Sequence, residues 1–549
     1  MTFIRKYWLE VLTIGAIFAG LLICNNPDMT WINTDSDGAH YILAAKYLTT
    51  AHHMSQPLYI LIGNLFLRIP LGTDAWRMGL ISVLATTIAC TYIYLSVRQL
   101  LKNNTKSRLY GIVAALVYGG SCLVITQSTI VETMPLAVMA GVIAYYYHLK
   151  GRYTVASIFC GIGLAVHPFL GFIVWAVLWV GSKQIRSKKN TIITILFFLF
   201  YLYIPIVKAV NPGATIMWGN DTAEGFFAGT YGMVSMLVGG LSIYDLPKRI
   251  LDTMGIVGIS FTIGMIPLIW YFIKRNTYKD KLFWLILIPI WFFMINLSAE
   301  TFVYMIVSVA FGAIAIGVGL SKLHINWSYA TGAILLIVMV VNFNMYDIGR
   351  TLDPNLSAHK FYTEELPKIK DGEIYMGGGW TWAIVYLYNH ENGTNIIPVC
   401  TDTLPADNYL DILEEQGINL QRTDSDNWIE QQWLVARSIA ELNDNVWIAK
   451  ETVPSSYEYE VVRAVDNTEL FTRWLGQDKD VVWNFTPSNP YRFITGSLQV
   501  DEWKFILWSN RNCLFFIVVG GLCYMIGHYG QKFINEKTKI KTKKEVSGS

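Results

Sequence analysis

The sequence predicts a polytopic α-helical membrane protein with about 12 transmembrane segments and an extracytoplasmic α/β domain. Three observations predict this class. Of the 549 residues, 53% are hydrophobic and 15% are charged, whereas soluble proteins carry about a quarter charged residues. Several apolar runs are long enough to cross a hydrocarbon core roughly 30 Å thick. Lys and Arg residues fall in every second loop between these runs, as expected if those loops are cytoplasmic.

The composition also excludes several classes. A net charge of +2 does not indicate a nucleic-acid partner. Of the seven cysteines, only Cys400 lies in a polar stretch, so no internal disulfide framework is expected. We find no Gly-rich nucleotide loop ending in Lys-Ser/Thr, no Cys/His cluster with zinc spacing and no Gly-x-Ser-x-Gly turn. No organic cofactor is expected.

The first predicted spans follow from the basic loops. Arg5 and Lys6 place the N-terminus inside, and we expect a retained helix over 8–24 rather than a cleaved signal peptide. An outside loop, 25–74, precedes helices over 76–101, 109–125 and 134–148. The run 155–180 has basic residues at both ends, so a single crossing would place one set outside. We therefore predict two short helices that turn at His167-Pro168.

The remaining spans are predicted over 191–207, 250–273, 282–295, 302–320 and 329–343, so residues 1–346 form the transmembrane module. Residues 347–504 form the extracytoplasmic domain, with strands near 373–376, 395–399 and 446–449 and helices near 382–388 and 409–415. Alternating strands and helices indicate a small α/β layer. A final helix, 505–528, returns the chain to a basic cytoplasmic tail, 529–549.

The first outside loop carries the densest chemistry. Asp35, Asp37 and His40 lie within six residues. The spacing over 39–47 suits an amphipathic helix on the membrane surface, with Asp37 at its N-terminus and its carboxylate held, ionised, by backbone N–H groups. Such an acid can bind or deprotonate an acceptor hydroxyl. The same pair also fits a plain helix cap and turn.

This loop resembles the GT-C superfamily of membrane glycosyltransferases, which carry an acidic motif in the first extracytoplasmic loop and take sugar from a polyprenyl phosphate. It is most similar to a group related to an animal protein O-mannosyltransferase, with Asp-Ser-Gly-Glu followed about fifteen residues later by His-Pro-Pro-Gly-x-Pro-Leu-Tyr. By spacing, Asp37 matches the motif aspartate, His52 the histidine, and residues 57–59 match Pro-Leu-Tyr. His40 stands where the group has glutamate. If the chemistry needs that second acid, either Asp35 or His40 replaces it or the activity is altered.

Later segments extend the resemblance over most of the chain. The segment containing Glu132 resembles the group's Gln-x4-Glu-Val-Tyr-x-Leu, with Met134 in place of the tyrosine. The segments of Lys208 and of Trp218 resemble Tyr-Leu-Pro-x-Arg followed by Trp-Gly-Asp. The resemblance implies that these residues bind substrate.

Physical arguments add further candidates on the same predicted face. Glu132 is an ionisable group near the outer surface, where such groups tend to be functional, although it also fits a solvated loop residue. His167, at the predicted helical turn, faces the same side. Lys208 or Arg77 could hold a lipid phosphate as a point charge, although Lys208 also fits simple snorkelling. His167 also fits a hydrogen-bonded core residue. Asp35 and Asp37 could hold a divalent ion, but no third ligand is evident.

The function that these observations favour is inverting transfer of a sugar, mannose or another hexose, from a polyprenyl-phosphate donor to an extracytoplasmic acceptor. The resemblance alone implies Ser or Thr of a protein as acceptor, with a lipid-linked or cell-surface glycan as the alternative. A transporter or flippase, and a non-catalytic glycan-assembly scaffold, stay open as other classes. The active site would face outside a bacterial or archaeal cell membrane, or the equivalent lumen of the endoplasmic reticulum.

Overall fold

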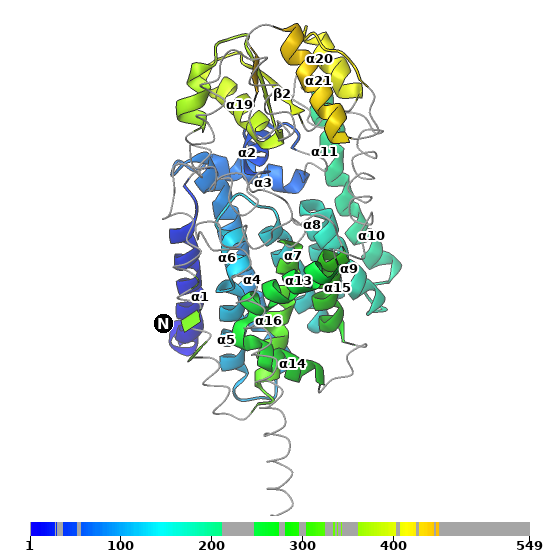
Figure 1. Ribbon diagram of the computed structural model, residues 1–549. Helices are drawn as coiled ribbons and strands as arrows, with labels where there is room; N and C mark the ends of the chain where they lie inside the picture. Colours follow the sequence, from blue (N-terminus) through cyan, green and yellow to red (C-terminus); the bar gives the residue numbers. More distant parts are fainter. Residues whose placement is uncertain are drawn as a thin grey trace, which may run out of the picture.

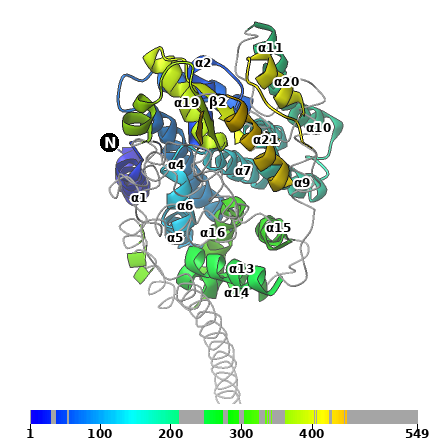
Figure 2. The ribbon, with the colours of Figure 1, turned by 45° about the horizontal axis from the view of Figure 1, so that its top comes forward.

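The fold of this chain comes from a computed structural model, shown in Figure 1 and, tilted, in Figure 2. A layer of short helices separates a bundle of apolar helices from a small α/β domain. The structure describes residues 2–27, 29, 37–51, 56–210, 246–273, 280–295, 303–323, 333–334, 337–338, 342, 361–401, 404, 407–423, 428–443 and 446–448.

The first helices lie close to the positions predicted for them. Helix α1 runs over Thr2–Cys24, α4 over Asp74–Leu100 and α7 over Met134–Leu149. The segment predicted as one helix over 109–125 is instead bent. Helix α5, Ser107–Gly119, and α6, Cys122–Ser128, meet at 63°, at a break that contains Gly120 and Ser121, which favour helix ends.

The predicted turn at His167-Pro168 is confirmed. Helix α8 spans Tyr153–Val166 and α9 spans Pro168–Val180. The two helices approach so closely that a Cβ atom on Gly171 would lie 2.4 Å from the carbonyl carbon of Gly163. Small residues permit this kind of backbone approach between membrane helices.

The later helices follow the predicted order, with local breaks. Helix α10, Lys188–Ile195, continues through a 3-10 turn, η2 (Leu196–Leu202), into α11, Tyr203–Val210. Helix α13, Leu246–Phe261, joins α14, Met265–Ile273, through a second 3-10 turn, η4 (Thr262–Gly264). Helices α15, Lys281–Ile295, and α16, Ile306–Leu320, complete the described bundle. The predicted helices over 329–343 and 505–528 and the tail lie essentially outside the described residues.

Within the described residues, five helices are long and apolar enough to cross a membrane, or six if the bent α5–α6 pair is one span. Five shorter apolar helices accompany them. These findings fit a polytopic helical membrane protein, and the count of twelve segments stays a prediction.

Contacts between helix ends agree with the predicted alternation. Arg108 at the start of α5 pairs with Glu10 of α1 at 2.7 Å, which places both predicted inside ends together. Lys281 at the start of α15 lies against Gly181, just after α9. At the other end, the backbone N–H of Asn26 donates to the carbonyl of Thr129 at 2.8 Å. Loops predicted on one side therefore gather at one end of the bundle.

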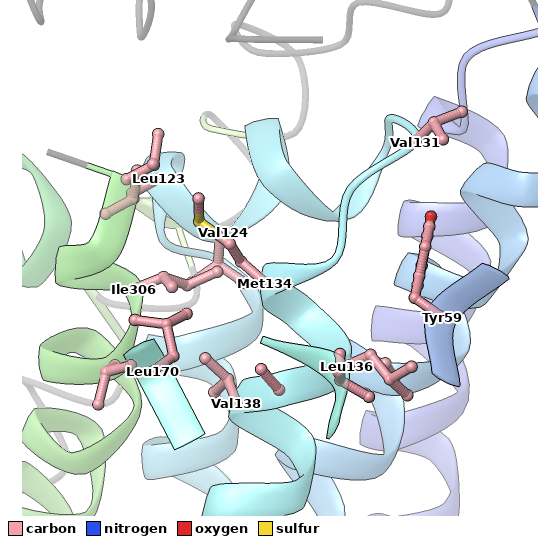
Figure 3. Close-up of a cluster of buried hydrophobic side chains, with 14 of the residues drawn as sticks. Tyr59, Leu123, Val124, Val131, Met134, Leu136, Val138, Leu170 and Ile306 are labelled. Atoms are coloured by element: carbon pink, nitrogen blue, oxygen red, sulfur yellow. The ribbon is translucent and has the colours of Figure 1, made fainter. Parts of the chain in front are cut away.

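The core of the bundle is apolar and continuous. Figure 3 shows one buried part of it, to which α6, α7, α9 and α16 contribute side chains, among them Leu123, Val124, Met134, Val138, Leu170 and Ile306. In a bilayer the alternative to this core is lipid and not water, so van der Waals packing of these side chains holds the helices together. This packed core fixes the helix ends on which the candidate site is built.

The α/β domain contains a three-stranded parallel sheet in the order β2-β1-β3. Strands β1, Ile374–Gly377, β2, Ile397–Cys400, and β3, Val446–Ile448, fall where the sequence predicts them. Helices α19, Gly379–Asn392, and α20, Asp407–Glu415, were also predicted, whereas α21, Trp428–Leu442, was not. Two short turns, η7 (Phe361–Glu365) and η8 (Leu366–Lys368), precede the sheet.

Two helices fill the loop predicted over 25–74. Helix α2, Gly38–Tyr47, matches the predicted helix, but α3, Pro57–Leu67, was missed. Figure 1 shows both in the layer between the bundle and the α/β domain. The prediction that α2 lies on the membrane surface is wrong, because Gly38 to Ala45 are all buried. Covered on both sides, α2 has no solvated face.

Candidate active site

Asp37 occupies the predicted position at the N-terminus of α2, but its side chain makes no capping hydrogen bond. The expected mode of holding its carboxylate is therefore wrong. Burial raises the pKa of Asp37 from 3.8 to about 7, because removal from water disfavours the charged form. Because the cap is missing and the pKa is raised, the expectation that a cap keeps Asp37 ionised is wrong.

Glu132 lies in the short link between α6 and α7 and is buried. Its Oε1 accepts the backbone N–H groups of Thr133 at 2.7 Å and Met134 at 3.3 Å, together with the Thr133 hydroxyl at 3.0 Å. The hydroxyl of Ser82 on α4 donates to the Glu132 carbonyl at 2.9 Å. The carboxylate is thereby fixed at the positive end of α7.

Asp37 and Glu132 are electrostatic neighbours. Burial, and then the charge of Asp37, raise the pKa of Glu132 from 4.5 to about 7. Asp37 is half-buried and Glu132 is buried. Because the two carboxyl groups repel one another, they ionise in coupled steps, so the pair holds a proton near neutral pH. The fold thus brings together two acids that the sequence identified separately.

Two tyrosines line the pair. Burial and the charges of Asp37 and Glu132 raise the pKa of Tyr41, which also hydrogen-bonds the Thr133 side chain. The ring of Tyr59 on α3 meets that of Tyr41 edge-on at 5.1 Å between centroids. In Figure 3 the Tyr59 hydroxyl points toward the segment of Val131, next to Glu132. Neither tyrosine was a candidate from sequence, although Tyr59 belongs to the Pro-Leu-Tyr motif.

His40 turns toward the α/β domain rather than replacing the missing motif acid. It is buried, and its ring meets that of Trp382 on α19 edge-on, 6.2 Å between centroids. Glu132 is the carboxylate that the fold places beside Asp37. The proposed substitution of His40 for the motif glutamate therefore has no support from this geometry.

Helix α19 docks alongside α2 through charged and aromatic contacts. Lys46 binds Asp74 at 2.8 Å and also pairs with Glu391 of α19. Tyr47 stacks on His390 with 4.3 Å between ring centroids. Figures 1 and 2 both show the two helices adjacent. The α/β domain is therefore attached to the helix that begins at Asp37.

The short helices run in parallel. Tyr41 lies against Tyr59, and one turn later the Asn64 side chain donates to the Ala45 carbonyl at 2.8 Å, so α2 and α3 run the same way. His40 lies against Trp382 and Tyr47 against His390, so α19 runs the same way too. Three helix N-termini, each with partial positive charge, thus lie at the level of Asp37.

His167 sits at the tip of the α8–α9 hairpin. Its Nδ1 accepts the backbone N–H of Leu170 at 3.4 Å, and its ring meets Tyr304 edge-on at 5.5 Å. Because α7 leads away from Glu132 and α8 returns, this tip lies at the same end of the bundle as Glu132. The capping role fits the core interpretation of this histidine and leaves its role in binding a prediction.

Arg77 does not fit the predicted phosphate role. Its three guanidinium nitrogens donate to the carbonyls of Leu67 at 2.7 Å, Leu71 at 3.1 Å and Gly72 at 2.9 Å, and Nη1 also pairs with Asp74 at 3.2 Å. With each nitrogen engaged, Arg77 closes the turn between α3 and α4. A cation with donors committed in this way is a structural clamp.

Three predicted site residues, Asp35, His52 and Trp218, lie outside the described residues, and for Lys208 only the backbone, within α11, is described. The structure adds Arg249, which sequence reasoning missed because it falls at the border between the predicted loop and helix. It is 7% exposed and lies over the ring of Phe293 on α15, 5.3 Å from the centroid. The signal in the sequence was a basic residue next to the start of a predicted apolar helix on the outer side. Its burial is visible only in the structure.

No group of three His, Cys, Asp or Glu side chains able to hold a metal ion occurs among the described residues. Asp37 and Glu132 supply two carboxylates. The described part of the site therefore offers acid–base chemistry, one buried arginine and aromatic walls.

Comparison with known proteins supports the fold. Residues 37–206 match the family model of the protein O-mannosyl-transferase TMEM260 N-terminal domain. The chain is similar to the crystal structure of ArnT from Cupriavidus metallidurans bound to undecaprenyl phosphate, with a TM-score of 0.50 at 11% identity, over 77% of this chain and 97% of that one. The apo state of ArnT gives a TM-score of 0.47 with the same identity and coverage. The search of curated proteins finds no match.

Proposed function

We propose that this chain, a GT-C-type membrane protein whose N-terminal region is like that of protein O-mannosyltransferases, transfers a hexose from a polyprenyl-phosphate donor to a hydroxyl group. The sugar would be mannose and the acceptor Ser or Thr of a protein on the extracytoplasmic side. The observation that carries the proposal is the pairing of half-buried Asp37 with buried Glu132, at the end of the bundle covered by the α/β domain.

Asp37 is the proposed base. An acid with a pKa near 7 is suited to take a proton from a hydroxyl at neutral pH, because general bases work best when their pKa lies near the operating pH. The acceptor oxygen would attack the anomeric carbon as the bond from that carbon to the phosphate oxygen breaks. One displacement of this kind inverts the anomeric centre, and the proton passes to Asp37.

Glu132 is the proposed partner of that base. Two backbone N–H groups hold it in place, and its charge makes Asp37 a stronger base once Glu132 is ionised. In this arrangement Glu132 takes the place of the motif glutamate, at whose position this chain has His40. Glu132 comes from a segment of the chain far from that motif.

The leaving phosphate needs a cation, and Arg249 is the candidate among described side chains. It is buried on α13 beside Phe293 of α15, and α15 packs on α9, which begins at His167. A guanidinium binds two phosphate oxygens at once. ArnT, which has a similar fold, was crystallised with undecaprenyl phosphate, and this supports a lipid-phosphate donor here. Lys208 remains a second candidate.

The test is transfer by the purified chain in liposomes. Polyprenyl-phosphate mannose with labelled sugar is supplied with a Ser/Thr peptide or with a lipid-linked glycan, and other polyprenyl-phosphate hexoses serve as competing donors. We expect label in the peptide, joined by an inverted linkage. Label only in the glycan would identify the alternative acceptor. Movement of intact donor across the bilayer without transfer would contradict the enzyme and favour a flippase.

A further inference from the structure

Trp382 is a buried aromatic residue of the α/β domain with an unused hydrogen-bond donor. The residue is 4% exposed, and its indole Nε1 has no hydrogen-bond partner in the described part of the structure. Trp and Tyr normally find a partner for their polar atom when buried. A buried donor without one costs free energy, and such exceptions in native proteins call for an explanation.

The position of Trp382 supplies that explanation. It lies in the first turn of α19, against His40 in the first turn of α2. Because the two helices run in parallel, the residues three places earlier, Gly379 and Asp37, lie at about the same level. The N-cap of α19 is Gly378, which has no side chain to cap the turn. The first-turn N–H groups of α19 and the Trp382 indole N–H therefore lie within about one helical turn of the level of Asp37, and these groups bind oxygen.

The side from which Trp382 approaches indicates which substrate it meets. Glu132 and Tyr59 belong to the bundle and the layer next to it, whereas Trp382 comes from the domain on the other side of α2 (Figure 1). A donor lipid enters from the bilayer, past the bundle. An acceptor that is not held in the bilayer must enter past the α/β domain.

We propose that Trp382 is an acceptor-binding residue whose indole N–H donates to a peptide carbonyl oxygen beside the reacting Ser or Thr. The hydroxyl itself is held at Asp37. A peptide fits this arrangement because it presents a carbonyl at a fixed separation from the side-chain hydroxyl of the same residue. The inference rests on the proposed function and adds to it the residue that recognises the acceptor backbone.

A purely structural role for Trp382 is distinguishable. Its ring also packs on Tyr386, with 4.4 Å between ring centroids, and that packing needs no N–H. Trp382→Phe keeps an aromatic ring and removes the donor. Trp175 on α9 is a matched control, because its Nε1 is also buried without a partner, among Phe172 and Trp179 in the bundle.

The experiment measures KM and kcat of peptide and donor separately. For Trp382→Phe we expect the peptide KM to rise roughly 3- to 10-fold, the effect of one lost hydrogen bond, with donor KM unchanged. Trp175→Phe should change neither. As a second readout, the chain is labelled with 5-fluorotryptophan. The ¹⁹F signal that disappears in Trp382→Phe should shift when peptide is added to wild type.

Three results would overturn the inference. Wild-type peptide KM in a folded Trp382→Phe variant would show that the N–H is not used. A rise in donor KM instead of peptide KM would place Trp382 on the donor side. A ¹⁹F signal of Trp382 that does not shift when peptide is added would show that the peptide does not contact it. Absence of transfer by wild type is a different failure, since it contradicts the proposed function and this inference with it.

Discussion

Replacing Glu132 by Gln should make the protein more stable at alkaline pH and less active. The glutamate pKa rises from 4.5 to about 7 in the folded state. At about 1.36 kcal/mol per pKa unit, this rise corresponds to a penalty on the order of 3 kcal/mol for the ionised form. Gln carries no charge and keeps an Oε1 acceptor for the N–H of Thr133, so the variant avoids that penalty.

The sign of the pH dependence follows from proton binding. Between pH 4.5 and about 7 the folded protein holds the Glu132 proton while the unfolded chain has released it. Stability of the wild type therefore falls as pH rises through this window. The Gln variant lacks this term, so its advantage should be absent near pH 4.5 and fully developed above pH 7.

Thermal unfolding in detergent checks this expectation. At pH 8 the midpoint of Glu132→Gln should exceed that of wild type by about 2–5 °C, and at pH 5 the two should nearly coincide. Glu441→Gln is the control, because Glu441 is exposed and pairs with Arg437 on the surface of α21. A lower midpoint at pH 8, or a difference that does not vary with pH, would refute the buried-carboxylate account. Transfer should fall in the same variant, because the variant lacks the charge that makes Asp37 a stronger base. A gain in stability with a loss of activity is common when a catalytic group is replaced.

Three further predictions, one of them with a control variant, test the fold and the site. Gly171→Ala should destabilise the protein by about 1–3 kcal/mol through its clash with the α8 backbone, whereas Gly15→Ala, with nothing described within 4 Å, should be neutral or slightly stabilising in the same unfolding assay. Lys46→Met should loosen the contact with Glu391 by less than about 1 kcal/mol, because the pair is partly exposed, and limited proteolysis should cut the α/β domain faster. Arg249→Gln should raise the donor KM about 10-fold with peptide KM unchanged, and an unchanged donor KM would exclude Arg249 from the phosphate site.

The sequence predicted the long helices well because charge and apolar length are local signals. Helix α4 begins at Asp74 and is followed by Lys102 and Lys106, and the α8–α9 turn follows from Pro168 and from the basic residues at both ends of the run. Helix α3 was missed because a mostly apolar stretch of eleven residues is too short for a span, and its starting Pro57 was treated as part of a loop motif. Its signal was Pro at the first helical position followed by an apolar run.

The site was predicted in its parts and not in its assembly. Asp37 and Glu132 were each identified, but their contact depends on how α2 packs against the α6–α7 link. The docking of α19 made His40 a neighbour of Trp382, a pairing that no sequence spacing indicates. Arg249 stands at a helix border, where burial depends on neighbours distant in the chain.

The most direct test of the central claim is the rate of mannose transfer from polyprenyl-phosphate mannose to peptide by Asp37→Asn. Asp411→Asn, which changes an exposed carboxylate of α20 paired with Arg422, is the matched control. We expect Asp37→Asn to lose transfer by a factor of about 100 or more, while it stays folded and still binds the donor, and Asp411→Asn to transfer like wild type. Equal transfer by Asp37→Asn and wild type would contradict the account.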